Sequence, residues 1–158
     1  MASQGGAALW QAASGGARDW PEAVAQDWTL LAQAPLGVRA DPAVICEAMR
    51  ESEGQALQYA SMELRSDGEF ILGAAQEIGA MVLQYSSERL RADRDFVMEV
   101  VDYCPPGDVI AYVPDAIREE LLSDRDFVLE AAQQEGAEIL QYADQALLGD
   151  RTFILAVA

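Results

Sequence analysis

The stretch SDRDFVLEAAQQEGAEILQYA, from Ser123 to Ala143, places two carboxylates and one base at the start of a helical apolar pattern. Asp124 and Asp126 flank Arg125, so acid–base catalysis is one interpretation. The other is that Asp124 starts a helix, because aspartate is a favoured N-cap residue and a second acid suits the positive end of the helix dipole. The choice depends on whether the stretch occurs once or several times in the chain.

The stretch is one copy of a repeat with a period of about 26 residues. The aspartates that start the copies are separated by 26, 26, 31 and 26 residues: Asp41, Asp67, Asp93, Asp124 and Asp150. A phenylalanine stands three positions after the last four of them, and the tripeptide LQY occurs in three copies. A leucine stands three positions before Asp67, Asp93 and Asp124, in the stretches LRSD, LRAD and LLSD. A catalytic site is not expected to recur at this period, so we assign these aspartates to helix capping.

Each copy predicts two short helices. The first begins at the aspartate and ends near a glycine such as Gly79 or Gly136, and the second carries the Leu-Gln-Tyr element. Neither helix is long enough to be stable alone, and a single unit cannot enclose its own apolar face. We therefore predict an all-α fold, a short α-solenoid of about five stacked two-helix repeats over residues 38–158. Residues 1–37 would form an N-terminal segment and helical cap.

These units resemble a short tandem α-helical repeat family of unknown function. Its units read Asp-Arg-x-Phe-Val-Leu, then Gly, Leu-Gln-Tyr-Ala and Leu-Arg-x-Asp, and the matching stretches here are residues 124–143 and 67–86. The resemblance covers roughly Asp41 to the C-terminus. It implies an all-helical repeat, found in bacteria and single-celled algae, and it implies no activity. The third unit departs from the pattern, with Ala111 where others have glutamine and five extra residues.

Composition excludes several classes of function. The net charge is −17, from 27 acids and 10 bases, which disfavours binding to nucleic acid or to anionic membrane surfaces. The chain has no histidine, so it lacks imidazole for catalysis and for the usual zinc or haem ligand sets. Cys46 and Cys104 lack metal-type spacing. We expect two buried thiols in a reducing compartment, with a disulfide as the alternative, and no metal or cofactor.

The sequence predicts a soluble intracellular protein. No apolar run approaches the roughly 18 residues of a membrane span. The N-terminal stretch from Met1 to Trp20 has neither the basic start nor the apolar run of a secretory signal. The algal distribution that the resemblance implies adds the chloroplast stroma as a compartment, with peripheral contact to a membrane complex.

The features that do not repeat are the candidates for a partner interface. All three tryptophans, Trp10, Trp20 and Trp28, precede the clear repeats, where they would pack as a cap or anchor a partner. Pro105 and Pro106 would stop the first helix of the third unit, and the insert CPPGD would then project as a recognition loop.

Tyrosines and arginines recur at fixed positions of the repeats, and each set allows two interpretations. The tyrosines (Tyr59, Tyr85, Tyr112 and Tyr142) favour packing between units, and the alternative is a groove for a peptide, small molecule or pigment. The arginines (Arg39, Arg65 and Arg91) suit helix C-termini, and the alternative is a phosphate-binding row.

The repeat and the missing catalytic set predict a non-catalytic protein-interaction or scaffold module, not an enzyme. The array reaches Ala158 on an apolar half-unit, so we expect protein partners in a larger multi-subunit assembly. The more specific prediction is that the chain is an accessory subunit on the soluble face of a photosynthetic complex. This prediction rests only on the algal distribution that the resemblance implies. The alternative is a small-molecule or pigment-binding module. A carboxylate-dependent hydrolase is the least favoured interpretation.

Overall fold

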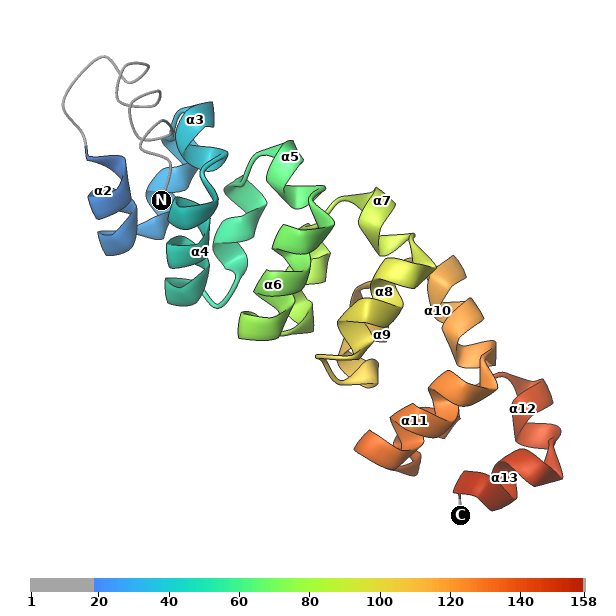
Figure 1. The fold of residues 1–158 in the computed structure, drawn as a ribbon. Coiled ribbons are helices and arrows are strands. Elements are labelled where there is room, and N and C mark those ends of the chain that lie inside the picture. The colour runs from blue at the N-terminus through green and yellow to red at the C-terminus, as the bar shows by residue number, and fades with distance from the viewer. Residues whose placement is uncertain (1–18, 158) are drawn as a thin grey trace. The chain divides into compact units, whose positions relative to one another are not determined.

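The structure, a computed structural model, describes residues 19–157 (Figure 1). This part of the chain is helical throughout and contains no β-strand. The predicted all-α class is confirmed, and the arrangement is compatible with a helical repeat.

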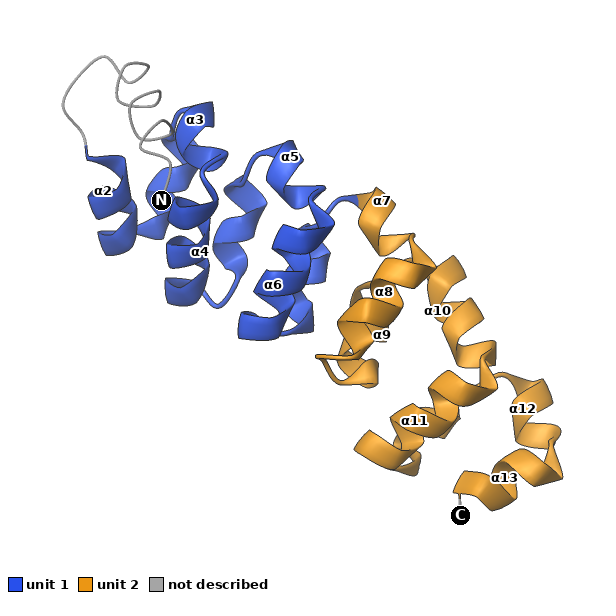
Figure 2. Ribbon diagram, viewed as in Figure 1, with its two compact units in different colours: residues 1–87 blue, residues 88–158 orange. Residues whose placement is uncertain are grey.

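The chain forms two compact units, residues 1–87 and residues 88–158 (Figure 2). The described helices of the first unit are α2 (Trp20–Gln26), η1 (Trp28–Gln33), α3 (Leu36–Arg39), α4 (Pro42–Glu51), η2 (Gln55–Tyr59), α5 (Met62–Arg65), α6 (Gly68–Ile78) and η3 (Ala80–Tyr85). Those of the second are α7 (Glu88–Arg91), α8 (Arg94–Val101), α9 (Pro106–Tyr112), α10 (Asp115–Ser123), α11 (Arg125–Glu135), η4 (Ala137–Tyr142), α12 (Gln145–Gly149) and α13 (Arg151–Val157). Elements named η are 3-10 helices.

The second helix predicted for each repeat is two separate elements. A 3-10 helix (η2, η3 or η4) is followed by a one-turn α-helix (α5, α7 or α12). A new N-cap divides them: the Ser61 hydroxyl accepts the Leu64 N–H at 3.3 Å, and the Asp144 carboxylate accepts the Ala146 N–H at 2.7 Å. The segment before each cap has five or six residues and forms a 3-10 helix, a form that occurs in short pieces.

The first unit is built from two rows of helices. In one row α2 packs on α4 and α4 on α6; in the other η1 packs on η2 and η2 on η3. Aliphatic side chains with 0–1% exposure fill the space between the rows: Val24, Leu31, Ile45, Leu57, Ile71 and Leu83. Backbone hydrogen bonds join successive repeats, from the Ser61 N–H to the Arg39 carbonyl at 2.8 Å and from the Ser87 N–H to the Arg65 carbonyl at 2.7 Å.

The second unit contains the irregular third repeat. Here α9 is an α-helix in the place of the 3-10 helix, and α10 replaces the one-turn helix. Pro114 stands where the other repeats have Ser61, Ser87 or Asp144, so this repeat has no N–H for the joining hydrogen bond. The next repeat restores that bond, from the Asp144 N–H to the Leu122 carbonyl at 3.1 Å.

The insert of the third repeat does not project as a loop, so that prediction is wrong. Pro105 is exposed, but Pro106 is buried and opens α9. Proline is well suited to the first position of a helix, where its missing N–H costs nothing. The two prolines therefore begin a helix after the turn that follows α8.

Candidate protein-interaction surfaces

The five repeat aspartates lie at helix N-termini and accept hydrogen bonds from the backbone. In each, one carboxylate oxygen accepts the N–H of the residue two positions on, and in all but the first also that of the third. The donor–acceptor distances run from 2.8 Å at Thr152 to 3.4 Å at Phe153. The aspartates are Asp41, Asp67, Asp93, Asp124 and Asp150. These carboxylates satisfy N–H groups that the helices leave unpaired.

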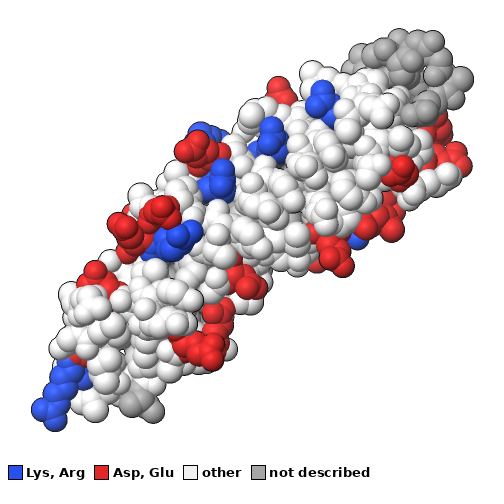
Figure 3. All heavy atoms as spheres, turned by 180° about the vertical axis from the view of Figure 1, so that it is seen from behind, with Lys and Arg blue, Asp and Glu red and all other residues white. Residues whose placement is uncertain are grey.

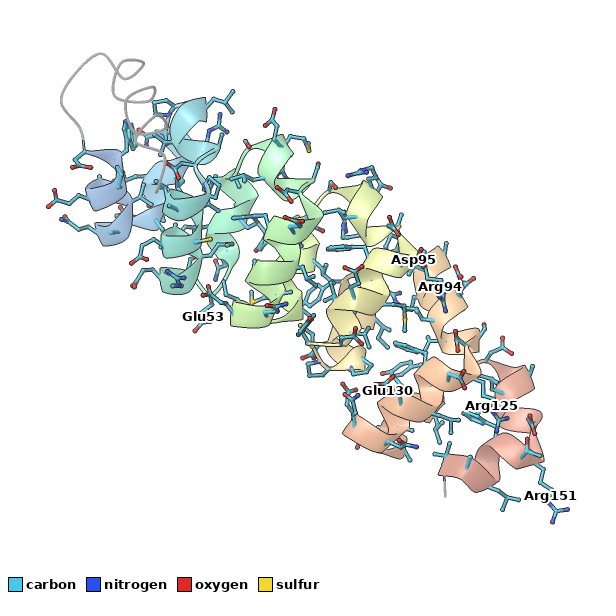
Figure 4. All side chains as sticks on the ribbon, viewed as in Figure 1. Glu53, Arg94, Asp95, Arg125, Glu130 and Arg151 are labelled. Atoms are coloured by element: carbon cyan, nitrogen blue, oxygen red, sulfur yellow. The ribbon has the colours of Figure 1, made fainter. Side chains whose placement is uncertain are left out.

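Two of the three capping aspartates in the second unit, Asp124 and Asp150, also pair with an arginine of the preceding repeat. Arg94 reaches Asp124 Oδ2 at 2.6 Å, and Arg125 reaches Asp150 Oδ2 at 3.3 Å. Figure 4 shows Arg94 between α8 and α10, where it also contacts Glu120 at 3.1 Å. Sequence reasoning missed this pairing, although the recurring Asp-Arg dipeptide was its signal: the arginine follows one cap and binds the next.

The Asp150 carboxylate is the most strongly hydrogen-bonded of these caps. The Thr152 hydroxyl donates to it at 2.7 Å, and the Thr152 and Phe153 N–H groups donate as well. The hydroxyl bond, then the backbone bonds and the nearby Arg125 lower the pKa of Asp150 below its ordinary 3.8. The Asp150 cap therefore keeps its negative charge at a lower pH than an ordinary aspartate does.

The three tryptophans proposed as partner anchors differ in what the structure shows of their exposure. Trp10 lies outside the described residues. Trp20 is buried at the start of α2, so it cannot serve as an exposed anchor. Trp28 is half-buried and packs against Tyr59, with ring centroids 6.2 Å apart at 40°. The two described tryptophans therefore belong to the packing of the first unit.

The Pro105–Pro106 segment is held within the second unit. The Gly107 N–H donates to both carboxylate oxygens of Glu135 at 3.0 Å, which ties the start of α9 to the end of α11. The tyrosine row is not uniform either. Tyr59, Tyr85 and Tyr112 are half-buried, whereas Tyr142 is exposed, so the packing expected of Tyr142 is wrong.

Two hollows could receive a ligand, and the arginine that lines each of them is already paired. A hollow of about 630 Å³ lies at the C-terminal ends of α4 and α6, where Arg50 bridges Glu77 at 2.9 Å and Glu47 at 3.2 Å. A hollow of about 340 Å³ in the second unit is lined by Gly107, Ile110, Ala111, Arg118, Leu122 and Tyr142. Its Arg118 guanidinium donates to the Ile110 and Val113 carbonyls and to Asp115.

The arginine row follows the ends of the one-turn helices. Arg39, Arg65 and Arg91 are each the last residue of α3, α5 and α7. Arg39 Nε donates to the Ala34 carbonyl at 3.1 Å, which fixes the guanidinium against its own repeat. The Nε atoms of Arg65 and Arg91 are also buried.

The cysteines and acids that the structure describes form no metal-ligand cluster. Among the described residues no group of three or more histidine, cysteine, aspartate or glutamate side chains could hold a metal ion. Cys46 and Cys104 are free thiols; Cys104 is buried as expected, whereas Cys46 is only half-buried, so that part of the prediction is wrong. Burial is the main cause that raises the pKa of each thiol. Within residues 19–157 no helix is long and apolar enough to cross a membrane.

Comparison with protein families identifies the repeats. The family described as a domain of unknown function (DUF4116) matches residues 41–91 and, a second time, residues 93–148. The chain belongs to the DUF4116 family. Each DUF4116 match begins at a capping aspartate, Asp41 or Asp93, and spans two of the aspartate-started repeats. Comparisons with curated proteins and with solved structures give no match.

The surface of this DUF4116 chain carries large apolar side chains in both units. Those of the first unit, Leu36 and Met62, stand at the same position of successive repeats, one at the start of α3 and one at the start of α5. Those of the second unit are Tyr103, Tyr142, Ile154 and Leu155. Sequence reasoning missed Leu36 and Met62, because the one-turn helices that expose them were not predicted.

Proposed function

We propose that this chain is a non-catalytic interaction module that binds protein partners of a larger assembly through exposed apolar side chains. The observation that carries the proposal is the repeated placement of Leu36 and Met62, with 58% and 60% exposure, on successive one-turn helices. Exposed apolar groups that recur at one repeat position form a surface, and such surfaces suit protein partners.

The chemistry of the acids supports a non-catalytic role. Asp124, the first of the two aspartates that suggested catalysis, accepts backbone N–H groups of its own helix and binds Arg94, and Asp150 does the same with its own helix and Arg125. A carboxylate engaged in this way stabilises the fold and is poorly placed to accept a substrate proton.

The finer form of the proposal is an accessory subunit on the soluble face of a multi-subunit complex. A photosynthetic complex, with the chain in the chloroplast stroma, is the version that the algal distribution of the resembling family motivates. The exposed residues favour a protein partner and do not choose among such complexes.

Affinity purification from the native cell tests the proposal. We expect the tagged chain to retain a protein partner at a fixed stoichiometry through size exclusion, and a Leu36→Ser, Met62→Ser double variant to lose it. An Ala25→Ser variant, exposed on α2 of the same unit, is the matched control and should keep the partner. A chain that remains monomeric and retains no partner in any form contradicts the proposal.

A small-molecule or pigment site is the second candidate, favoured by the hollow beside Tyr142. Its lining includes the apolar side chains Ile110 and Leu122 with the exposed phenol ring. Native mass spectrometry of chain purified from its own cell checks it: a bound species lost in Tyr142→Ala supports this site, and bare chain mass contradicts it.

A further inference from the structure

The turn that follows α4 has a glutamate at a position where two other repeats have glycine. Glu53 stands 12 residues after the capping aspartate of the first repeat, and Gly79 and Gly136 stand 12 residues after those of the second and fourth. All three have a positive φ: 52° at Glu53, 111° at Gly79 and 93° at Gly136. Residues other than glycine rarely adopt such a φ. Glycine would suit this turn better, so the backbone does not account for the glutamate.

The backbone next to Glu53 is held in place on both sides. The Gly54 N–H donates to the Met49 carbonyl at 2.8 Å, which ties the turn to the end of α4. A Cβ added at Gly54 would lie 3.3 Å from Ile78 Cγ2, so the turn packs closely on the second repeat. The Glu53 side chain therefore projects from a fixed point of the first unit.

Glu53 lines the hollow of about 630 Å³ at the C-terminal ends of α4 and α6. Figure 4 shows its side chain beside these two helix ends. We call this the α4–α6 hollow; three apolar and three charged residues line it: Met49, Ile78, Met81, Arg50, Glu53 and Glu77. Met49 is buried, whereas Ile78 and Met81 are half-buried and keep surface that a ligand can contact.

One carboxylate of the α4–α6 hollow has no cationic partner. Arg50 is fully engaged, with one terminal nitrogen 2.9 Å from Glu77 and the other 3.2 Å from Glu47. Glu53 is exposed and forms no ion pair with any described residue. One arginine and two glutamates give the lining a net charge of −1. The hollow thus offers a carboxylate beside half-buried apolar side chains.

We propose that the α4–α6 hollow binds a lysine or arginine side chain of a protein partner. The cationic head pairs with Glu53, and the aliphatic stem lies against Ile78 and Met81. A methionine suits such a contact, because its flexible side chain adapts to the shape of its neighbour. The net charge of −17 also favours a basic partner. The inference rests on the proposed interaction function and adds a second contact and a partner chemistry to it.

Capped tripeptides with arginine or lysine between two alanines are the probes. Nuclear magnetic resonance of the full chain, with isotope-labelled methionine methyl groups, measures binding in about 150 mM sodium chloride, where long-range attraction is screened. We expect saturable shifts of the Met49 and Met81 signals, with a dissociation constant on the order of 1–10 mM for so small a ligand. Met98, half-buried like Met81 but outside the hollow, is the control and should not shift.

The charge of the ligand is tested with a matched tripeptide. Norleucine in place of lysine keeps an aliphatic stem and removes the cationic head. This peptide should bind about three- to tenfold more weakly, because the ion pair with Glu53 is lost.

Glu53→Gly separates binding from folding. Glycine suits the positive φ, so this variant should unfold at the same temperature as the natural chain or a higher one. The same change should weaken binding of both basic tripeptides about three- to tenfold, and Glu53→Gln should weaken it to a similar extent. Glu69→Gln removes an equal charge from an exposed side chain in the first turn of α6, and it should leave binding unchanged.

Four results would overturn the proposal. They are no saturable shift of Met49 or Met81 at up to about 20 mM peptide, binding that Glu53→Gly leaves unchanged, an equal shift of Met98, and a lower unfolding temperature of Glu53→Gly. A small amine that co-purifies with the natural chain and is absent from the Glu53→Gly chain would instead assign the hollow to a free ligand. None of these results depends on Leu36 or Met62, so the proposed function can fail or survive separately.

Discussion

At the scale of single residues, the two oxygens of a capping aspartate have different partners. Asp124 Oδ1 accepts the N–H groups of Asp126 and Phe127, at 3.0 and 3.3 Å, and its Oδ2 accepts from Arg94. Asp41 caps α4 through Ala43 and has no ion pair with a described arginine. The comparison of these two aspartates separates the energy of the cap from the energy of the arginine pair.

We predict that Asp124→Ala lowers the free energy of unfolding by about 1–2 kcal/mol, because it removes both the cap and the pair. Asp124→Asn keeps the cap and should cost about 0.2–1 kcal/mol, the usual worth of a partly exposed ion pair. Asp41→Asn is the control and should be close to neutral. Urea unfolding followed by circular dichroism measures all three, and equal losses for the two asparagine variants would refute a stabilising role for Arg94.

At the scale of elements, the sequence predicts the first helix of each repeat well and the second half poorly. The aspartate caps are local signals that start α4, α6, α8 and α11, and the glycines Gly79 and Gly136 are local signals that end α6 and α11. The structure of the second half of each repeat depends on whether Ser61 or Asp144 continues one helix or caps a new one. Both choices can bury Leu83 and Leu90, which stand seven residues apart, so the apolar spacing does not choose between them.

The candidate surfaces depended on long-range packing that a sequence pattern does not carry. Tyr142 repeats the position of Tyr59, yet only Tyr59 has a tryptophan beside it. Pro106 can stop one helix or start another, and here it starts α9. The Arg94–Asp124 and Arg125–Asp150 ion pairs join residues that lie 30 and 25 positions apart, and the sequence pattern did not predict them.

One of the contacts that join the irregular third repeat to the fourth lies between Glu135 and Gly107. A Cβ added at Gly107 would lie 2.3 Å from Glu135 Oε2, so the carboxylate would have to move. Gly73, in the middle of α6, has nothing within 4 Å of such a Cβ. The two helical glycines therefore differ in whether a methyl group is accommodated.

We predict that Gly73→Ala stabilises the chain by about 0.5–1 kcal/mol, the usual gain for alanine over glycine in a helix. Gly107→Ala should show no such gain, because it displaces a hydrogen-bonded carboxylate. In a Glu135→Ala background the obstacle is gone, and Gly107→Ala should become stabilising relative to that background. Thermal unfolding of Gly73→Ala, Gly107→Ala, Glu135→Ala and the Gly107→Ala, Glu135→Ala double variant measures these changes in stability. Additive effects of Gly107→Ala and Glu135→Ala would show that the contact between Gly107 and Glu135 does not stabilise the third repeat.

At the scale of the whole molecule, the charge is spread thinly and is mostly unpaired. The acids outnumber the bases by 27 to 10, and the face in Figure 3 shows acidic side chains scattered among uncharged surface. The ion pairs between described side chains are largely half-exposed, as in Arg50–Glu77 with 52% and 50% exposure. Such pairs are worth little each, so repulsion among the excess acids should dominate the effect of salt.

We predict that the chain unfolds at a higher temperature in 150 mM than in 10 mM sodium chloride at pH 7. The Debye length falls from about 30 Å to about 8 Å between these concentrations, which screens the long-range repulsion of the excess acids. The control is the same pair of measurements near the isoelectric point of about 4.1, where net repulsion vanishes and added salt should no longer stabilise. A lower melting temperature in salt at pH 7 would mean that the arginine pairs, and not the excess acids, govern the electrostatic part of the stability.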